Sequence, residues 1–354
     1  MRFFLTYKYL FVLLFCFVFF RLLGCWTFFI ENIYIPFYNW YSECLRFVLG
    51  YIPFSLGDFL YVIAILIIGS KTYKVFKTKD KPKGYVVNFV AKILCVFYVM
   101  FTILWSLNIN RIPLAEKLNL KSDYTQEELI EVTDLLADRL NTLHYKYTKN
   151  INKQLEIPLS LHDIFKTAPE GYQVIKDLHE DFSYNNPTVK SSEISTVLTY
   201  MGFSGYINPF TNEAHVNALM PVNNTLMTAS HEIAHQIGIV PENEANFLGY
   251  LAAKHNPNLY YDYAATSFAL RYCLKRYPFK NEEEFKIYLE KLNPGIIKDW
   301  KQTKDFWEEH KTFVDSIFEF VYDSFLKINQ QEFGMEGYSK FIDYLIAYEL
   351  NKKG

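Results

Sequence analysis

The stretch HEIAHQIGIVPENEANF, from His231 to Phe247, contains the residues on which the interpretation of the whole chain depends. His231 and His235 are four positions apart, so on an α-helix they share one face and can direct both imidazoles at a single metal ion. Glu232 lies beside the first histidine, where its carboxylate can act as a general base toward water and then protonate a leaving amine. The spacing therefore predicts a metal centre on a helix.

The neighbours of these residues help to decide between a metal centre and the polar face of an ordinary helix. In HEIAHQIG the residues around the polar trio are mostly apolar, so we expect the helix to be buried. Buried polar groups need partners, and one metal ion provides a partner for both histidines. The sequence therefore favours a metal centre over a solvated helix face.

A catalytic zinc site usually has three protein ligands and one open position, so the two histidines require a third ligand. Two imidazoles and a carboxylate suit zinc better than other metals. Glu242 and Glu244 follow the histidines after a turn. If the chain forms a helical hairpin centred near Ile239, Glu244 lies opposite the histidines, which slightly favours Glu244 as the ligand. Glu242 remains the alternative.

Apolar residues are concentrated in the first 110 positions of this 354-residue chain. Three apolar runs, at about residues 9–30, 54–76 and 85–109, are long enough to cross a bilayer as helices. We therefore expect a three-helix transmembrane region at residues 1–110, with the lipid bilayer as a partner, and a separate domain at residues 111–354. The net charge of -2 gives no indication of nucleic-acid binding.

Basic residues predict the orientation of the chain in the membrane. Residues 71–84 contain six lysines and one aspartate, and short loops rich in lysine and arginine stay in the cytoplasm. Arg2 and Lys8 assign the N-terminus to the same side. We therefore expect a multi-pass protein of the cytoplasmic (inner) membrane, with the N-terminus inside and residues 111–354 outside the cytoplasm.

Residues 111–354 are expected to form an α+β fold in which helices are the majority. Helical patterns are found at residues 125–147, at about 171–182 and at 241–254, and the metal-binding helix is expected to end at Gly238. Gly, Pro and Asn interrupt residues 202–221, which predicts a hairpin or edge strands directly before that helix.

Four motifs carry a resemblance to known proteins. HEIAHQIG and ENEANFLGYLA, at residues 231–238 and 242–252, resemble the HExxH superfamily of zincin metallopeptidases, particularly members with a glutamate ligand. With the three spans, PFSLGD at 53–58 and PFTNEAHVN at 209–217, they are similar to an uncharacterised bacterial membrane family with a predicted zinc peptidase site. This resemblance extends over nearly the whole chain and implies one zinc ion in a zincin-like metallopeptidase domain.

The resemblance also bears on the third ligand. Glu242 with Asn246 one turn later resembles the glutamate ligand and supporting residue of such peptidases, which favours Glu242 over Glu244. The usual support is an aspartate, so the orienting role of Asn246 is a departure from the pattern. Only six residues separate His235 from Glu242, far fewer than in thermolysin-like enzymes. Both glutamates therefore stay candidates.

Substrate contacts are implied by the same resemblance. In zincin folds an edge strand before the metal-binding helix pairs with extended substrate, and PFTNEAHVNAL at residues 209–219 corresponds to that strand. His215 in this segment is then a candidate substrate contact. Tyr261 or Tyr263 is a candidate donor to the oxyanion, as tyrosines are in several zinc peptidases.

The expected function is that of a membrane-anchored zinc-dependent metallopeptidase that hydrolyses peptide bonds of envelope or membrane proteins. An intramembrane protease is less expected, because HEIAH follows the last span by more than 100 residues. The alternative is a non-catalytic membrane protein that keeps the zincin fold as a binding or sensing module. Glu232 argues against this alternative, because a purely structural site has no use for a base.

Overall fold

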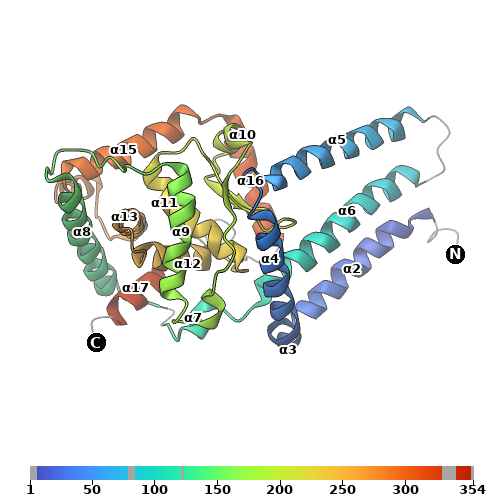
Figure 1. The fold of residues 1–354 in the computed structure, drawn as a ribbon, viewed down its shortest axis with the longest axis horizontal. Coiled ribbons are helices and arrows are strands. Elements are labelled where there is room, and N and C mark those ends of the chain that lie inside the picture. Colours follow the sequence, from blue (N-terminus) through green and yellow to red (C-terminus); the bar gives the residue numbers. More distant parts are fainter. Residues whose placement is uncertain (1–5, 79–83, 121–122, 329–339, 352–354) are drawn as a thin grey trace.

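The computed structural model describes residues 6–78, 84–120, 123–328 and 340–351. The chain is mostly helical and has one small sheet, as the sequence predicts. Figure 1 shows three helices that extend from one side of a globular part and contain the apolar runs of the N-terminal region. They are α2 (Lys8–Gly24), α5 (Leu56–Lys77) and α6 (Tyr85–Leu104).

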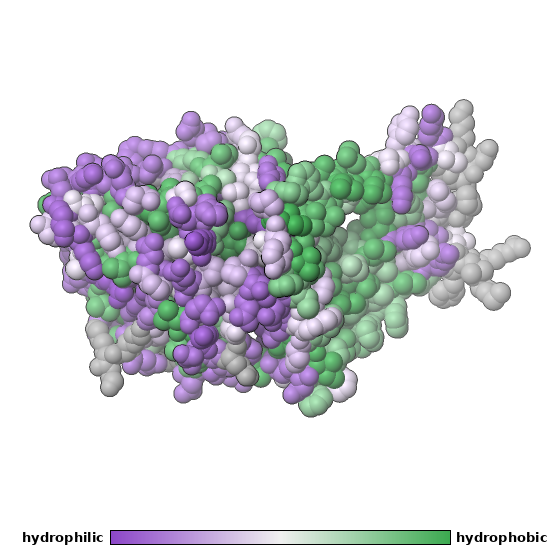
Figure 2. Space-filling view, viewed as in Figure 1, coloured by the Kyte–Doolittle hydropathy of each residue, from purple (hydrophilic) through white to green (hydrophobic). Residues whose placement is uncertain are grey.

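Two of these helices, α5 and α6, are each long and apolar enough to span a membrane. Their bounds agree with the predicted spans at 54–76 and 85–109. Figure 2 shows their apolar surface continuing from the globular part to polar groups near the far end. Two or three helices of the described chain could therefore cross a bilayer, depending on how the first apolar run is counted.

The first predicted span, at residues 9–30, is not one straight helix. Helix α2 ends at Gly24, and the chain bends by 86° into a second helical stretch over Thr27–Leu49. The bend occurs at Trp26, whose φ of -94° and ψ of 84° leave the helical region. The second stretch consists of α3 (Thr27–Phe29), the π-helix η1 (Ile30–Tyr34) and α4 (Ile35–Leu49).

Helix α4 lies along the globular part and is partly built into it (Figure 1). Tyr38 and Arg46 are buried, and both donate hydrogen bonds to the carbonyl oxygen of Gln236, over 3.2 and 3.3 Å. Contacts between the N-terminal region and the helix that carries His231 and His235 therefore cross the boundary that the sequence suggests at residue 110.

The globular part is organised around two central helices, α11 (Val222–Gln236) and α12 (Glu242–Lys254), which pack along each other and against α9 and α13. Predicted helices at 125–147 and 241–254 are confirmed, whereas the one at 171–182 is wrong because α9 already ends at Ile175.

The other helices are α7 (Leu114–Lys117), α8 (Gln126–Thr148), α9 (Leu161–Ile175), α10 (Ser195–Tyr200), α13 (Leu259–Arg276), α14 (Glu282–Leu289), α15 (Pro294–Glu309), α16 (Phe313–Ile328) and α17 (Phe341–Asn351), with the 3-10 helices η2 (Ser106–Asn110) and η3 (Glu180–Phe182).

The sheet contains β1 (Val189–Ser191), β2 (Gly205–Ile207) and β3 (Ala214–Val216) in the order β1-β3-β2. Strands β2 and β3 are antiparallel, which confirms the predicted hairpin at 202–221, and β1 is parallel to β3. The expectation that residues 209–219 form an edge strand is wrong, because β3 is paired on both sides. The strand before α11 that has a free edge within this sheet is β2.

The segment around β3 instead holds the start of membrane helix α5. Glu213 is fully buried, and its carboxylate accepts hydrogen bonds from the backbone amides of Leu56 and Gly57, over 3.2 and 2.7 Å. Lys190 on β1 neutralises this carboxylate at 2.6 Å. A negative group at a helix N-terminus is stabilising, so the motifs at 53–58 and 209–217 join α5 to the sheet.

His215 belongs to the same junction. Its Nε2 is 2.7 Å from the Oγ of Ser55, and that oxygen also accepts a hydrogen bond from the Asp58 amide as the N-cap of α5. Burial lowers the pKa of His215 to about 4, so the imidazole is neutral near neutral pH. His215 therefore contacts the base of a membrane helix in this structure.

Candidate metal centre

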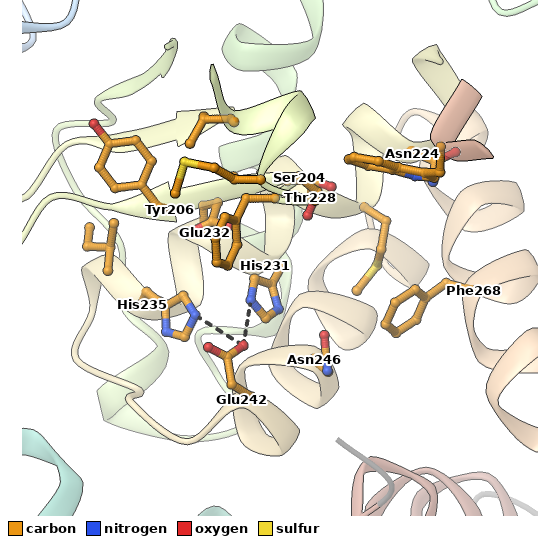
Figure 3. Close-up of a pocket in the computed structure, with 18 of the residues that line it drawn as sticks. Ser204, Tyr206, Asn224, Thr228, His231, Glu232, His235, Glu242, Asn246 and Phe268 are labelled. Carbon is orange, nitrogen blue, oxygen red and sulfur yellow. Dashed lines mark ion pairs between the residues drawn. The ribbon is translucent and has the colours of Figure 1, made fainter. Parts of the chain in front are cut away.

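His231, His235 and Glu242 come together at the junction of α11 and α12. The Nε2 atoms of His231 and His235 lie 3.3 and 3.7 Å from the same carboxylate oxygen of Glu242. One possible ligand atom from each residue lies within 4.8 Å of the others, so a single ion could contact all three. Figure 3 shows both imidazoles directed at the Glu242 carboxylate.

The turn between the two helices brings Glu242 to this position. Gly238 has a φ of +92°, a conformation that favours glycine, and Pro241 precedes the first residue of α12. The helices then approach closely at Gly249, where a Cβ atom would lie 2.9 Å from the Cα of His231. The first turn of α12 is consequently held beside the end of α11 that carries His235.

Glu244, the slightly preferred third ligand, lies elsewhere. Its carboxylate accepts a hydrogen bond from the backbone amide of Leu114 over 3.0 Å. Residues two positions apart on an α-helix project in nearly opposite directions, so Glu242 and Glu244 cannot both face the histidines. Because α12 begins at Glu242, this residue faces the histidines, and the preference for Glu244 does not agree with the structure.

Both histidines are inside the protein, but only one has its second nitrogen engaged. The Nδ1 of His235 is 2.6 Å from the carbonyl oxygen of Ile239. A carbonyl can only accept, so Nδ1 carries a proton, and in the neutral imidazole Nε2 is the nitrogen that could bind a metal. The Nδ1 of His231 and the Nδ2 of Asn246 are buried without hydrogen-bond partners in the described structure. Asn246 thus lies near the site without the supporting hydrogen bond that the sequence suggested.

Glu232 is buried, and one of its carboxylate oxygens, Oε2, has no hydrogen-bond partner within the described residues. Strand β2 covers the other oxygen so closely that a Cβ atom at Gly205 would lie 2.6 Å from it. Burial raises the pKa of Glu232 to about 7, while the nearby His231 and His235 lower it. Three possible metal ligands thus lie beside a buried carboxylate whose Oε2 has no hydrogen-bond partner within the described residues.

A cavity of about 950 Å³ opens over these groups. Glu232, His231, His235 and Glu242 form part of its wall, and so does Asn246. Besides residues of α10 and α11, the wall includes residues of the membrane-length helices, of strand β2 and of α13 and α15. Residues that represent these four regions are Tyr61, Phe97, Gly205, Arg271, Tyr272 and Trp300.

With this geometry described, the chain can be compared with known proteins. Residues 35–346 match a family described as a protein of unknown function, DUF3810. The match covers well over half of the chain. The chain belongs to the DUF3810 family. No curated protein and no solved structure matches it.

The region matched to DUF3810 begins at Ile35, the first residue of α4. It therefore contains α4, both membrane-length helices and the candidate metal centre, whereas α2 precedes it. The contacts of α4 with α11 lie inside one family unit. This agrees with the close packing of the N-terminal region on the metal-binding helix.

Two tyrosines that the sequence suggested as oxyanion donors do not line the cavity in this DUF3810 member. Tyr261 donates its hydroxyl to the carbonyl of Ile164 over 2.7 Å, and the hydroxyl of Tyr263 binds Asp299. Both rings are buried in the core, and neither lines the cavity. His215, the suggested substrate contact, is likewise absent from the wall.

The structure adds residues that the sequence did not single out. Tyr272 lines the cavity, and its hydroxyl has no hydrogen-bond partner within the described part of the chain. It lies on α13 with Tyr261, about three helical turns later at 3.6 residues per turn. The periodicity of α13 marks these two tyrosines as sharing one face, but the sequence does not show which end of the helix reaches the cavity.

Proposed function

We propose that this chain is a membrane-anchored zinc-dependent peptidase. The observation that carries the proposal is that His231, His235 and Glu242 meet around one point beside the buried Glu232 carboxylate. One oxygen of that carboxylate, Oε2, has no hydrogen-bond partner among the described residues. A structural metal site usually has four protein ligands, whereas a catalytic one has three and an open position. Three candidate ligands beside a large cavity correspond to the catalytic type.

The three side chains suit zinc. Two imidazole nitrogens and one carboxylate form a common catalytic zinc set, and the carbonyl of Ile239 already fixes the tautomer of His235. When bound at such a site, zinc polarises a carbonyl group and lowers the pKa of water. Since Glu242 contacts both imidazoles, it would complete the set without a rearrangement of α12.

Glu232 has the position required of a general base in peptide hydrolysis. Its free oxygen would accept a proton from the attacking water and then deliver it to the leaving amine. Gly205 leaves no space for the carboxylate to move toward β2, so the side chain is held in place. Tyr272 would donate a hydrogen bond to the oxygen of the substrate carbonyl as negative charge develops on it.

Strand β2 offers a place for the substrate backbone. It is at the edge of the sheet, and residues 203–207 line the cavity. An extended peptide can add to a free strand edge through backbone hydrogen bonds. Strand β2 thus takes the place of residues 209–219 as the strand expected to pair with the substrate backbone.

The charge at the far end of α5 supports an orientation in the membrane. Lys71, Lys74 and Lys77 lie near the end of α5 that is remote from the globular part. Basic residues beside short loops favour the cytoplasmic side. We therefore assign the metal centre to the opposite, extracytoplasmic side of the cytoplasmic membrane.

The proposal is tested with the purified full-length chain in detergent. We expect about one zinc per chain by elemental analysis and hydrolysis of casein-derived peptides. In Glu232→Gln the zinc should remain while turnover falls by about 10²–10⁴-fold, and in His231→Ala the zinc should be lost. Zinc binding with no hydrolysis in any chain would favour the binding or sensing module, and a folded chain without zinc would refute the metal centre.

A further inference from the structure

The cavity at the metal centre continues onto the membrane helices. Its wall includes Tyr61 of α5 and Phe97 and Phe101 of α6. Phe97 is seven residues before the end of α6 at Leu104, or roughly 10 Å along the helix axis at 1.5 Å per residue. If α6 spans a bilayer, part of the cavity lies at the depth of the hydrocarbon layer.

The end of α6 also reaches the metal centre. Trp105 follows its last residue, lines the cavity and contacts His235 edge to face, with 6.1 Å between the ring centroids. The metal motif is remote from the spans along the sequence and adjacent to them in space. This removes the reason for expecting a site well separated from the membrane.

Helices α5 and α6 are separated at their base by the β2–β3 hairpin. The ring of Phe210 lies 6.3 Å from that of Tyr61 and 5.9 Å from that of Phe97, measured between centroids. Among the described residues, α6 packs along α2, whereas α5 packs along neither of them, and α5 is almost fully exposed. Tyr61 of α5 and Phe97 of α6 both line the cavity, and the two helices extend away from it as separate arms (Figure 1).

The helix faces that carry Tyr61 and Phe97 are apolar. Ile65 and Ile68 share a face of α5 with Tyr61, and Val90 and Leu94 share a face of α6 with Phe97. These four aliphatic side chains are exposed. The groove is defined by these two apolar faces together with Tyr61 and Phe97 at the cavity wall.

We propose that this groove receives a transmembrane helix of the substrate, so that the peptidase acts on membrane-embedded polypeptides close to the bilayer. The inference rests on the proposed function. One continuous surface joins apolar helix faces to the free edge of β2 and the candidate metal centre. A polypeptide fits both ends, because it must be helical within a bilayer and can become extended at a strand edge outside it. A lipid chain would fit only the apolar end.

The test measures binding of a membrane probe to the full-length chain in liposomes. The probe is a Leu/Ala helix of about 20 residues with a short polar tail, detected by Förster transfer. Ile65→Trp fills the groove and should weaken binding about tenfold or more, since added volume excludes a packed helix. Leu66→Trp, the adjacent exposed position on another face of α5, is the matched control and should bind like the unmodified chain.

Two outcomes would overturn the inference. Equal binding by the Ile65→Trp and Leu66→Trp chains would show that the groove holds no helix. A second probe carries the same polar tail on a palmitoyl chain. If it binds as tightly as the helix probe, and if Ile65→Trp weakens its binding too, the groove is a lipid site. Zinc content and hydrolysis of free casein-derived peptides are measured on the same chains. If the chain binds the helix probe but neither binds zinc nor hydrolyses peptides, only the proposed peptidase function is refuted. If it hydrolyses free peptides but does not bind the helix probe, only the proposed role of the groove is refuted.

Discussion

Glu242 and Glu244 differ by two positions in sequence and by the face of α12 from which they project. Glu242 contacts both histidines, whereas Glu244 binds the amide of Leu114. We expect Glu242→Gln to weaken zinc binding by about 100-fold or more, because a metal site with two histidines alone loses its carboxylate charge. Glu244→Gln should retain zinc. Competition with a chelator measures both affinities, and zinc loss only in Glu244→Gln would refute Glu242 as the third ligand.

Tyr272 provides a second test at the level of single residues. Tyr272 lines the cavity and is our proposed oxyanion donor, so Tyr272→Phe should lower kcat by about 10²-fold through loss of a hydrogen bond to the developing oxyanion. KM and zinc content should change little. Tyr261→Phe is the matched control: it removes a hydroxyl that binds Ile164 in the core, at a cost of about 1 kcal/mol in stability. An equal loss of kcat in the two variants would refute the role of Tyr272.

Helical spacing alone was sufficient to bring His231, Glu232 and His235 to one site, because all three lie on α11. The identity of the third candidate ligand depended on where α12 begins. Gly238 and Pro241 set that start through the geometry of the turn between α11 and α12. The tyrosines could not be chosen from sequence. Their roles depend on how far along α13 the cavity extends.

Among the elements, the contact between α11 and α12 is the one that keeps the site assembled. In Gly249→Ala the added Cβ would lie 2.9 Å from the backbone of His231, so α12 has to move away. We expect a loss of about 1–3 kcal/mol in stability from overpacking, together with weaker zinc binding. Thermal unfolding and chelator competition measure the two effects.

The matched control is Gly69→Ala on α5, where a Cβ meets no atom within 4 Å. There alanine should be neutral or stabilise the helix by about 0.5–1 kcal/mol. Equal behaviour of the two substitutions would mean that the close approach at Gly249 has no energetic importance.

Periodicity predicted most of the helices but not the features that depend on other parts of the chain. Strand β1 has only three residues, Val189–Ser191, which is too short for an alternating pattern, and its pairing makes β3 central. The bend at Trp26 accompanies the packing of α4 against the globular part, which apolar composition does not reveal.

For the whole molecule, contacts join the N-terminal region to residues 111–354, so we expect that residues 111–354 do not fold as an independent unit. Tyr38 and Arg46 bind the carbonyl of Gln236 at the end of α11, and Trp105 contacts His235. The fragment 111–354 leaves this end of α11 without these partners. We expect it to bind zinc poorly and to lack a cooperative thermal transition, whereas the full-length chain shows both properties.

A substitution in the full-length chain tests the same contacts without removing the spans. Arg46→Met deletes hydrogen bonds to Asn185, Asn212 and Gln236 and should cost about 2–4 kcal/mol in stability, because buried acceptors lose their donor. Lys74→Met, at an exposed position near the far end of α5, should have little effect. A fragment that folds and binds zinc like the full chain would contradict this view of the molecule.

If α6 spans a bilayer, the contact of Trp105 with His235 would hold the candidate metal centre at one height above it, because α6 ends where the site begins. An enzyme built in this way would cleave at a distance set by its own structure. Its cuts would fall at a constant distance from the bilayer boundary, whatever the local amino-acid sequence, and a substrate would be selected by where its chain leaves the lipid.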